Sequence, residues 1–245
     1  LHNHWIKINN INAIYEKKKL ETNELKNIIL EIKERKIFGI NVTVPFKKEI
    51  IKHLNSLTPE AENTQSVNTI YLDQDKVIGH NTDINGFELA IKKTKFDIKN
   101  KRILILGAGG VVPSIIYVLK KMGVSNISVT NRTTGKAENL KNLFKNIDLI
   151  DWGVLPNFDM IINATSVGLN MKDEFKLDFS NIKKNTFFYD VIYNPKETKF
   201  LEIGKKMGCR IENGKMMFIY QASASFKLWH GIEPAINDEI IRLLD

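Results

Sequence analysis

The sequence predicts an α/β fold that contains a parallel β-sheet. From residue 85 onward, short apolar runs typical of strands alternate with helical segments of about 10 to 15 residues, which is the order expected for a parallel sheet covered by helices on both faces. A glycine-rich turn, GAGG at 107–110, joins one such strand to the next helix. The chain has 245 residues, of which 43% are hydrophobic and 26% charged, as in a soluble globular protein with room for one large domain or two modest ones.

The first strongly periodic segment predicts an amphipathic helix over residues 22–35. Four apolar residues recur there at i, i+3, i+4 and i+7, with charged residues between them: Leu25, Ile28, Ile29 and Ile32. Thr22 has a side chain preferred at the N-cap, so we expect it to cap this helix.

A strand is expected next, over residues 40–44. Apolar and polar side chains alternate along it: Ile40, Asn41, Val42, Thr43 and Val44. Because successive side chains of a strand point to opposite faces, the asparagine and the threonine share one face. Pro45 ends the strand, and helical spacing resumes over 46–54.

The remaining elements follow from capping residues and periodicity. Thr58 before Pro59 is typical of an N-cap and a first helical residue. Residues 67–72 and 76–80 predict a hairpin. Later strands are expected at 102–106, 127–130, 160–163 and 187–191. Later helices are expected at 85–93, from the glycine-rich turn to Met122 with Gly123 at its end, at 134–145, at 198–207 and at 214–229.

The charge balance and the cysteine content indicate what kinds of ligand and which cellular compartment the protein suits. Lysine and arginine outnumber aspartate and glutamate by 36 to 28, which favours an anionic ligand or partner. No block of five like charges occurs, which disfavours a dedicated nucleic-acid-binding protein. The single cysteine, Cys209, is expected to be a buried small hydrophobe and suits a reducing compartment such as the cytoplasm. The apolar run 103–119 is too interrupted by glycine and proline to predict a membrane span.

The glycine-rich turn indicates a nucleotide site. Glycines between an apolar strand and a helix let a pyrophosphate approach the backbone at the helix N-terminus, as in Rossmann-like domains. The match is imperfect, because Val112 stands where the fingerprint has its third glycine or alanine. A tight strand-to-helix turn without a ligand is the alternative.

The stretch NRTTGK after the next strand favours NADP over NAD. Asn131, Arg132, Thr133 and Lys136 stand where NAD-binding domains usually carry a carboxylate for the ribose hydroxyl. A guanidinium and an ammonium instead suit the phosphate of NADP. Two solvated cations with no ligand are the alternative interpretation.

Taken in order, these stretches resemble the shikimate dehydrogenases. The similar motifs are NVTVPFK at 41–47, NTD at 81–83, GAGG at 107–110, NRT at 131–133, NATSVG at 163–168, YDVIYNPKET at 189–198 and NGKMMFIYQASASFKLWHG at 213–231. The resemblance covers nearly the whole chain, and HN at 2–3 looks like the end of the family's first motif.

The resemblance implies an enzyme that reversibly reduces 3-dehydroshikimate to shikimate with NADPH, on the route to chorismate and the aromatic amino acids. It implies an α/β substrate-binding domain from residues 1–83 and 215–245, and a Rossmann-like NADP-binding domain from residues 84–214. The implied partner is a small-molecule substrate, without nucleic acid or membrane. We expect a cytoplasmic monomer or homodimer.

Site residues are implied by the same resemblance, position by position. The implied catalytic pair is Lys47 and Asp83. Residues implied to hold the substrate are Thr43, Asn68, Asp83, Tyr193 and Gln221. Residues implied to hold the phosphates and ribose of NADP are Gly107, Ala108, Gly109, Gly110, Asn131, Arg132, Thr133 and Lys136. Residues implied to line the nicotinamide end are Thr165, Ser166, Ile192 and Gly214. No metal is implied, and the five histidines show no metal-ligand spacing.

The chemistry of ketone reduction assigns roles to the implied pair. A hydride comes from the nicotinamide, and the alkoxide that forms needs a proton. Lys47 is the candidate proton donor, and Asp83 is expected to pair with it and to accept a hydrogen bond from a substrate hydroxyl. The polar face of strand 40–44 is expected to meet the substrate, and Lys48 is expected to be an ordinary surface charge.

Each of these residues also has a plainer interpretation. A single lysine is most often a solvated charge, and Asp83 could be the N-cap of the following helix. Asn68 could be a turn residue, and Gln221 an exposed helix position.

The beginning of the chain keeps further alternatives open. The family's opening strand and a serine-bearing loop for the substrate carboxylate precede the position of His2, so we expect either a missing upstream segment or impaired substrate binding. The alternatives are a quinate/shikimate dehydrogenase of broader specificity, a nucleotide-binding remnant without catalysis, and a basic nucleic-acid-binding protein.

Overall fold

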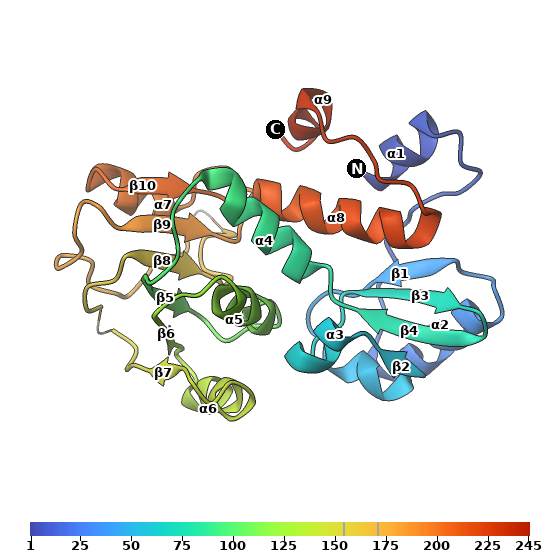
Figure 1. The fold of residues 1–245 in the computed structure, drawn as a ribbon, viewed down its shortest axis with the longest axis horizontal. Coiled ribbons are helices and arrows are strands. Elements are labelled where there is room, and N and C mark those ends of the chain that lie inside the picture. The colour runs from blue at the N-terminus through green and yellow to red at the C-terminus, as the bar shows by residue number, and fades with distance from the viewer. Residues whose placement is uncertain (154, 171) are drawn as a thin grey trace. The chain divides into compact units, whose positions relative to one another are not determined.

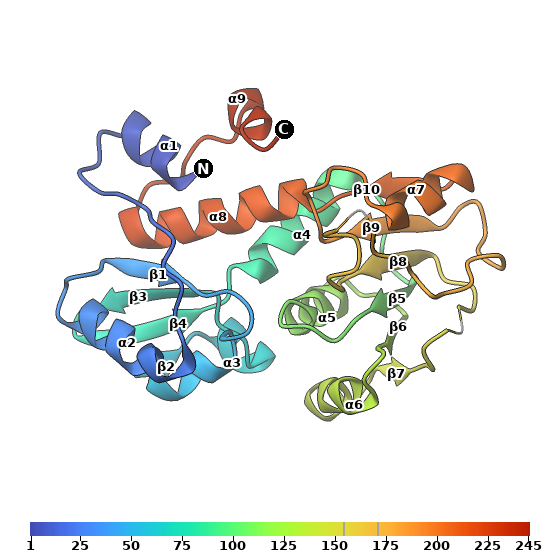
Figure 2. The ribbon, with the colours of Figure 1, turned by 180° about the vertical axis from the view of Figure 1, so that it is seen from behind.

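The computed structural model describes residues 1–153, 155–170 and 172–245, which form two compact units. Unit 1 comprises Leu1–Phe87 and Ile219–Asp245, and unit 2 comprises Glu88–Phe218. Helices α4 (Asp83–Thr94) and α8 (Lys215–His230) each begin in one unit and end in the other. Figures 1 and 2 show the two units from opposite sides.

Unit 2 is built on a six-stranded parallel sheet (Figure 1). Its strand order is β10-β9-β8-β5-β6-β7, and all neighbouring strands are parallel. The strands are β5 (Arg102–Leu106), β6 (Asn126–Thr130), β7 (Asp148–Leu149), β8 (Met160–Asn163), β9 (Phe187–Asp190) and β10 (Arg210–Glu212). The predicted strands are confirmed to within one residue. β7 and β10 were not predicted, because two or three residues are too few to set a period.

Helices cover both faces of this sheet, as predicted. Besides the ends of α4 and α8, unit 2 contains α5 (Val112–Lys121), α6 (Thr134–Leu143) and α7 (Lys199–Lys206). Helix α7 packs on β9 and β10, and α6 packs on β7. Every residue of β8 and β9 is buried, which requires cover on both faces and explains their uninterrupted apolar runs. Cys209 lies in this core, as predicted.

Unit 1 contains a smaller, mixed sheet of order β1-β3-β4-β2. Its strands are β1 (Gly39–Asn41), β2 (Ser56–Leu57), β3 (Thr69–Asp73) and β4 (Lys76–His80). The antiparallel pair β3 and β4 is the predicted hairpin. Its helices are α1 (His2–Ile8), α2 (Leu25–Lys33), α3 (Pro59–Thr64) and α9 (Asp238–Arg242), with 3-10 turns at Thr22–Glu24 and Glu49–His53. The four predicted apolar positions of α2 are all buried in the core of this unit.

The capping predictions had different outcomes. The hydroxyl of Thr58 accepts the N–H of Ala61 at 3.4 Å, with Pro59 at the first helical position, so this N-cap is confirmed. Thr22 does not cap α2. Instead, the backbone N–H of Glu21 donates to the carboxylate of Glu24 at 2.6 Å, which stabilises a 3-10 turn ahead of the helix.

The predicted strand over 40–44 is shorter than its alternation suggested. β1 ends at Asn41, and the N–H of Phe46 donates to the carbonyl of Thr43 at 2.9 Å, which closes a turn around a cis peptide bond between Val44 and Pro45. Val44 is consequently 71% exposed and does not join Val42 in the core. The helical prediction for 46–54 is realised only as the 3-10 turn Glu49–His53.

Candidate functional site

Lys47 and Asp83 form a largely buried ion pair in unit 1. The ammonium nitrogen Nζ lies 2.5 Å from Oδ2 of the carboxylate, and the side chains are 14% and 9% exposed. Lys47 stands in the turn after β1, and its carbonyl accepts the N–H of Val67 at 2.8 Å. Asp83 is the first residue of α4. Because both charges are largely removed from water, each depends on the other, and Lys47 is not a solvated surface charge.

Asn68 and Gln221 extend this pair into a polar cluster. The amide nitrogen of Asn68 donates to Oδ1 of Asp83 at 3.0 Å and to the side-chain oxygen of Gln221 at 3.4 Å. The amide oxygen of Asn68 accepts the backbone N–H of Thr82 at 2.7 Å, which fixes the orientation of the amide. Asn68 is 3% exposed, so this side chain is not a solvated turn residue.

A layer of buried hydroxyl groups supports Asn68. The hydroxyl oxygens of Thr69, Thr82 and Ser225 lie 2.8 to 3.1 Å from one another, and all three residues are fully buried. The side-chain amide of Asn41 donates to Ser225 at 3.0 Å, and its oxygen accepts the hydroxyl of Tyr15 at 2.9 Å. Asn41 is therefore tied into the protein interior, and the expectation that it faces a ligand together with Thr43 is wrong.

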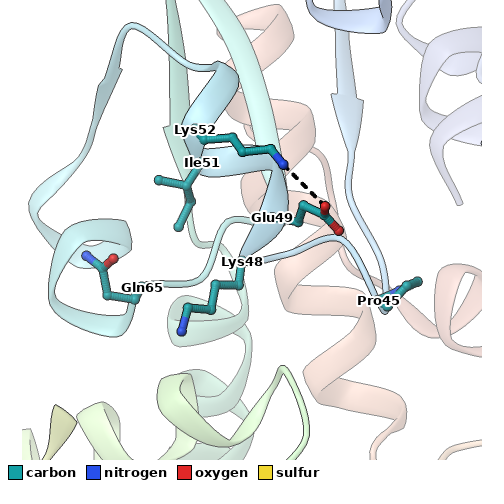
Figure 3. Close-up of a pocket in the computed structure, with 6 residues that line it drawn as sticks. All are labelled: Pro45, Lys48, Glu49, Ile51, Lys52 and Gln65. Carbon is teal, nitrogen blue, oxygen red and sulfur yellow. Dashed lines mark hydrogen bonds and ion pairs between the residues drawn. The ribbon is translucent and has the colours of Figure 1, made fainter. Parts of the chain in front are cut away.

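Two predicted positions near the pair are solvent-exposed. Thr43 lies in the turn after β1 and is exposed. Lys48 is exposed as well, and it lines a surface pocket of about 450 Å³ together with Pro45, Glu49, Ile51, Lys52 and Gln65. Figure 3 shows the amine of Lys52 directed toward Glu49 and the amine of Lys48 directed away from it. Lys48 is thus the surface charge that the sequence predicted, one residue from the buried Lys47.

The glycine-rich turn of unit 2 lies where β5 leads into α5. Gly107 has φ of +109°, and a Cβ there would lie 2.9 Å from the carbonyl oxygen of Ala164. Its N–H donates to the carbonyl of Thr130 at 2.8 Å. Both the backbone conformation and the close approach require glycine. Ala108, Gly109 and Gly110 complete the turn at the carboxyl edge of the parallel sheet, where open α/β sheets bind ligands.

The predicted phosphate-binding cations follow β6 at the same edge. Asn131 donates from its side-chain amide to the carbonyl of Thr133 at 2.8 Å, which shapes the turn into α6. Arg132 and Lys136 are exposed and available to a ligand.

The residues assigned to the nicotinamide end lie on the loops after β8, β9 and β10. The hydroxyl of Thr165 donates to the side-chain oxygen of Asn163 at 2.7 Å, and the neighbouring Ser166 is exposed. Ile192 is buried, and its carbonyl accepts the N–H of Gly214 at 3.1 Å. A Cβ at Gly214 would collide with the backbone of Val191, so glycine is required.

Tyr193 continues the loop after β9. Its ring stacks on that of Phe218, with ring centroids 4.5 Å apart and an interplanar angle of 25°. Burial raises the pKa of Tyr193, so the phenol stays protonated and can donate a hydrogen bond.

The described residues offer neither a metal site nor a membrane-spanning helix. In residues 1–153, 155–170 and 172–245, no group of three His, Cys, Asp or Glu side chains could hold a metal ion. No helix of the described chain is long and apolar enough to cross a membrane.

Comparison with known proteins identifies the family. One family model, the shikimate dehydrogenase substrate binding domain, matches residues 1–70, and another, shikimate / quinate 5-dehydrogenase, matches residues 88–199. A curated protein of Pelagibacter ubique (strain HTCC1062), named shikimate dehydrogenase (NADP(+)), is 55% identical over 245 residues, covering 100% of this chain and 92% of the relative. The chain belongs to the shikimate dehydrogenase family.

Other shikimate dehydrogenases agree in sequence and fold. A relative of Methanococcus aeolicus with the same name is 37% identical over 247 residues, covering 97% of this chain and 88% of the relative. The crystal structure of shikimate 5-dehydrogenase from Thermus thermophilus, in complex with NADP(H) and shikimate, superimposes with a TM-score of 0.89 at 28% identity, covering 100% of this chain and 93% of that one. The predicted two-domain α/β fold with a Rossmann-like parallel sheet is therefore confirmed.

Several polar residues of this shikimate dehydrogenase fold were missed by sequence reasoning. They are the buried hydroxyl residues Thr69, Thr82 and Ser225, and the network of Asn163, Asp190 and Thr198. One signal was available for Asp190, because a carboxylate at the end of an otherwise apolar strand is expensive to bury without several hydrogen-bond donors.

Proposed function

We propose that the protein catalyses the reversible, NADPH-dependent reduction of 3-dehydroshikimate to shikimate, a step toward chorismate and the aromatic amino acids. The observation that carries the proposal is the buried pair of Lys47 and Asp83, with Nζ and Oδ2 2.5 Å apart. Support also comes from the relative of Pelagibacter ubique, named shikimate dehydrogenase (NADP(+)), and from the structure of Thermus thermophilus, which holds NADP(H) and shikimate.

Lys47 and Asp83 have the properties that the reaction requires of a proton donor and its partner. When bound, the nicotinamide supplies the hydride. The ammonium of Lys47 stabilises the negative charge that develops on the carbonyl oxygen and then gives that oxygen a proton. Asp83 holds the ammonium in place and accepts a hydrogen bond from the adjacent substrate hydroxyl.

The neighbouring polar side chains orient the substrate in this proposal. Asn68 and Gln221 lie in the same cluster as Asp83 and offer amide groups to the ring hydroxyls and the carboxylate. Thr43 is exposed in the turn just before Lys47 and offers a hydroxyl group. Separately from this cluster, the protonated phenol of Tyr193 is proposed as a further hydrogen-bond donor to the substrate.

Unit 2 would hold NADP at the carboxyl edge of its sheet. The glycine-rich turn of Gly107, Ala108, Gly109 and Gly110 lets the pyrophosphate approach the backbone at the start of α5. Arg132 and Lys136 bind the 2'-phosphate, with Asn131 and Thr133 shaping their loop. Thr165, Ser166, Ile192 and Gly214 line the nicotinamide end.

The same proposal assigns substrate binding and NADP binding to different domains. Residues 1–83 and 215–245 bind the substrate, and residues 84–214 bind NADP. The protein works as a cytoplasmic monomer or homodimer without nucleic acid. The scattered basic residues and the single buried cysteine support this part of the proposal.

Steady-state oxidation of NADPH tests the proposal. The protein should oxidise NADPH when 3-dehydroshikimate is added, and should reduce NADP when shikimate is added. Quinate in place of shikimate tests the broader-specificity alternative. Absence of turnover with either shikimate-pathway compound, in protein that binds NADPH, would contradict the proposed activity and favour a nucleotide-binding remnant.

A further inference from the structure

The carboxyl ends of β8 and β9 meet at a fully buried carboxylate, Asp190. This residue ends β9, is 0% exposed, and pairs in register with Asn163, which ends β8. Its Oδ1 accepts the side-chain amide of Asn163 at 3.0 Å and the backbone N–H of Ile192 at 2.9 Å. Its Oδ2 accepts the hydroxyl of Thr198 at 2.6 Å. Burying a carboxylate is costly, and these three donors offset that cost.

The three donors come from separate segments of unit 2. Asn163 belongs to the end of β8, where its side chain also accepts the N–H and the hydroxyl of Thr165 at 3.0 and 2.7 Å. Ile192 belongs to the loop after β9, and Thr198 is the N-cap of α7. The Asp190 carboxylate is therefore the common acceptor that ties both loops and the start of α7 to the sheet edge.

A fourth segment is joined through Ile192. The carbonyl of Ile192 accepts the N–H of Gly214, which packs against the backbone of Val191. Three of the four residues assigned above to the nicotinamide end thus rest on the Asp190 network: Thr165, Ile192 and Gly214. The fourth, Ser166, directly follows Thr165. Tyr193 directly follows the anchored Ile192.

We propose that Asp190 is a positioning residue for the nicotinamide half of the cofactor site. Its carboxylate sets the separation and orientation of the loops after β8 and β9, and does not itself touch the cofactor. This inference rests on the proposed function, because it takes the nicotinamide to bind against those loops. The cations after β6, which would hold the 2'-phosphate of the adenosine half, belong to another segment than the three donors to Asp190. The turn at 107–110, assigned to the pyrophosphate, approaches the loop after β8 at Gly107.

Substitution by asparagine separates the shape of Asp190 from its charge. An asparagine oxygen at the position of Oδ1 would still accept from Asn163 and from the N–H of Ile192. Its amide nitrogen would donate to the Thr198 hydroxyl, which can accept a hydrogen bond. Asp190→Asn should therefore keep the loops in place, whereas Asp190→Ala leaves all three donors without this partner.

The test compares two ligands by isothermal titration calorimetry. NADPH reaches both halves of the cofactor site, whereas adenosine 2',5'-bisphosphate occupies only the adenosine half. Asp190→Ala should weaken NADPH binding about tenfold or more and lower kcat on the order of 100-fold, with adenosine 2',5'-bisphosphate affinity unchanged within about twofold. Asp190→Asn should restore NADPH affinity to within about threefold of the unsubstituted protein.

Asp159→Ala is the matched control. Asp159 precedes β8 at the opposite edge of the sheet, where its carboxylate accepts the N–H of Arg102 at 2.8 Å. Its removal costs one exposed hydrogen bond to the backbone of the same sheet, and should leave both affinities unchanged. If Asp190→Ala does not fold, Thr198→Val is the alternative variant. It removes one hydrogen-bond donor to Asp190 and should lower the affinity for NADPH about threefold, with the affinity for adenosine 2',5'-bisphosphate unchanged.

The outcomes distinguish a positioning role from a purely structural one. If Asp190→Ala lowers the affinities for NADPH and for adenosine 2',5'-bisphosphate equally, unit 2 is loosened as a whole and the proposal is overturned. Unchanged affinity for NADPH would also overturn it. Failure of the proposed function has another readout: unsubstituted protein would bind neither ligand, or would bind NADPH without reducing 3-dehydroshikimate. If the protein binds neither ligand, the role proposed for Asp190 fails as well. If it binds NADPH without reducing 3-dehydroshikimate, the comparison of the two ligands still tests that role.

Discussion

The ammonium of Lys47 lies 2.5 Å from the carboxylate of Asp83, and the second oxygen of that carboxylate accepts the amide of Asn68 at 3.0 Å. Both oxygens of Asp83 are thus engaged by side chains from two other segments of unit 1. A pair this well buried differs from a surface salt bridge, whose contribution to stability is usually small. The arrangement keeps a positive charge and a hydrogen-bond acceptor side by side, as reduction of a hydroxylated ketone requires.

Asp83→Asn should abolish most of the turnover. The amide cannot balance the charge of Lys47, and its NH2 group would face another donor, either the ammonium of Lys47 or the side-chain amide of Asn68. We expect kcat to fall on the order of 100-fold, with NADPH affinity unchanged within about twofold, because NADP is assigned to unit 2. Stopped-flow kinetics and calorimetry measure the two quantities. A loss of NADPH affinity equal to the loss of kcat would argue against this role.

Ser225→Ala should destabilise the support beneath Asn68. The substitution removes a hydrogen-bond partner of Asn41, Thr69 and Thr82 in a fully buried layer. We expect the free energy of unfolding to fall by about 1 to 3 kcal/mol and kcat/KM to fall severalfold. Urea denaturation measures the first effect. Ser56→Ala, at an exposed position of unit 1, is the control and should be close to neutral.

Arg132→Ala should reduce the preference for NADPH over NADH. The unsubstituted protein should bind NADPH at least about tenfold more tightly, because the guanidinium matches the 2'-phosphate. The variant should lose most of that preference, because its affinity for NADPH falls while its affinity for NADH stays unchanged. Lys141→Ala, near the other end of α6, is the control. Equal affinities for the two cofactors in the unsubstituted protein would contradict the assignment.

Asp190 should make the stability of the protein depend on pH. Burial raises its pKa from 3.8 to about 6, against the effect of its hydrogen bonds from Thr198, Ile192 and Asn163. The folded protein therefore binds this proton more tightly than the unfolded chain does. The stabilisation is complete below about pH 4 and is lost as the pH rises through about 6, a loss on the order of 3 kcal/mol.

Asp190→Asn carries no such proton, so the difference between the two proteins isolates this group. The free energy of unfolding of the variant, relative to the unsubstituted protein, should rise by about 3 kcal/mol between about pH 4 and pH 7. Urea denaturation at several pH values measures it. A difference that stays constant over this range, or that falls, would mean that the carboxyl is not buried as described.

The sequence predicted the elements of unit 2 more fully than the site that they carry. The strands 102–106 and 160–163 are uniformly apolar apart from their ends and the helix ending at Met122 has a clear period, so local pattern and tertiary burial agree. The polar network of Asp190 depends on which strand ends become neighbours. The pairing of Asn163 with Asp190 is fixed by the strand order and cannot be read from spacing along the chain.

The stretch from Ile40 to Lys48 shows the same limit in unit 1. Alternation predicted a strand to Val44, but a turn closed by Thr43 and Phe46 leaves Val44 exposed. Spacing alone could not separate the two adjacent lysines, because their environments depend on Asp83, which is 36 residues from Lys47 in the sequence. The expected difference between Lys47 and Lys48 came from the family resemblance. Physically, the burial of Lys47 depends on its ion pair with Asp83.

Turnover of Lys47→Ala and Lys48→Ala, measured side by side with NADPH and 3-dehydroshikimate, tests the catalytic assignment most directly. Lys47→Ala should lose at least about 100-fold in kcat while binding NADPH normally, because it removes the proton donor. Lys48→Ala, which alters only an exposed charge, should keep kcat within about twofold. If Lys47→Ala keeps kcat within about tenfold of the unsubstituted protein, the pair of Lys47 and Asp83 is not the catalytic centre.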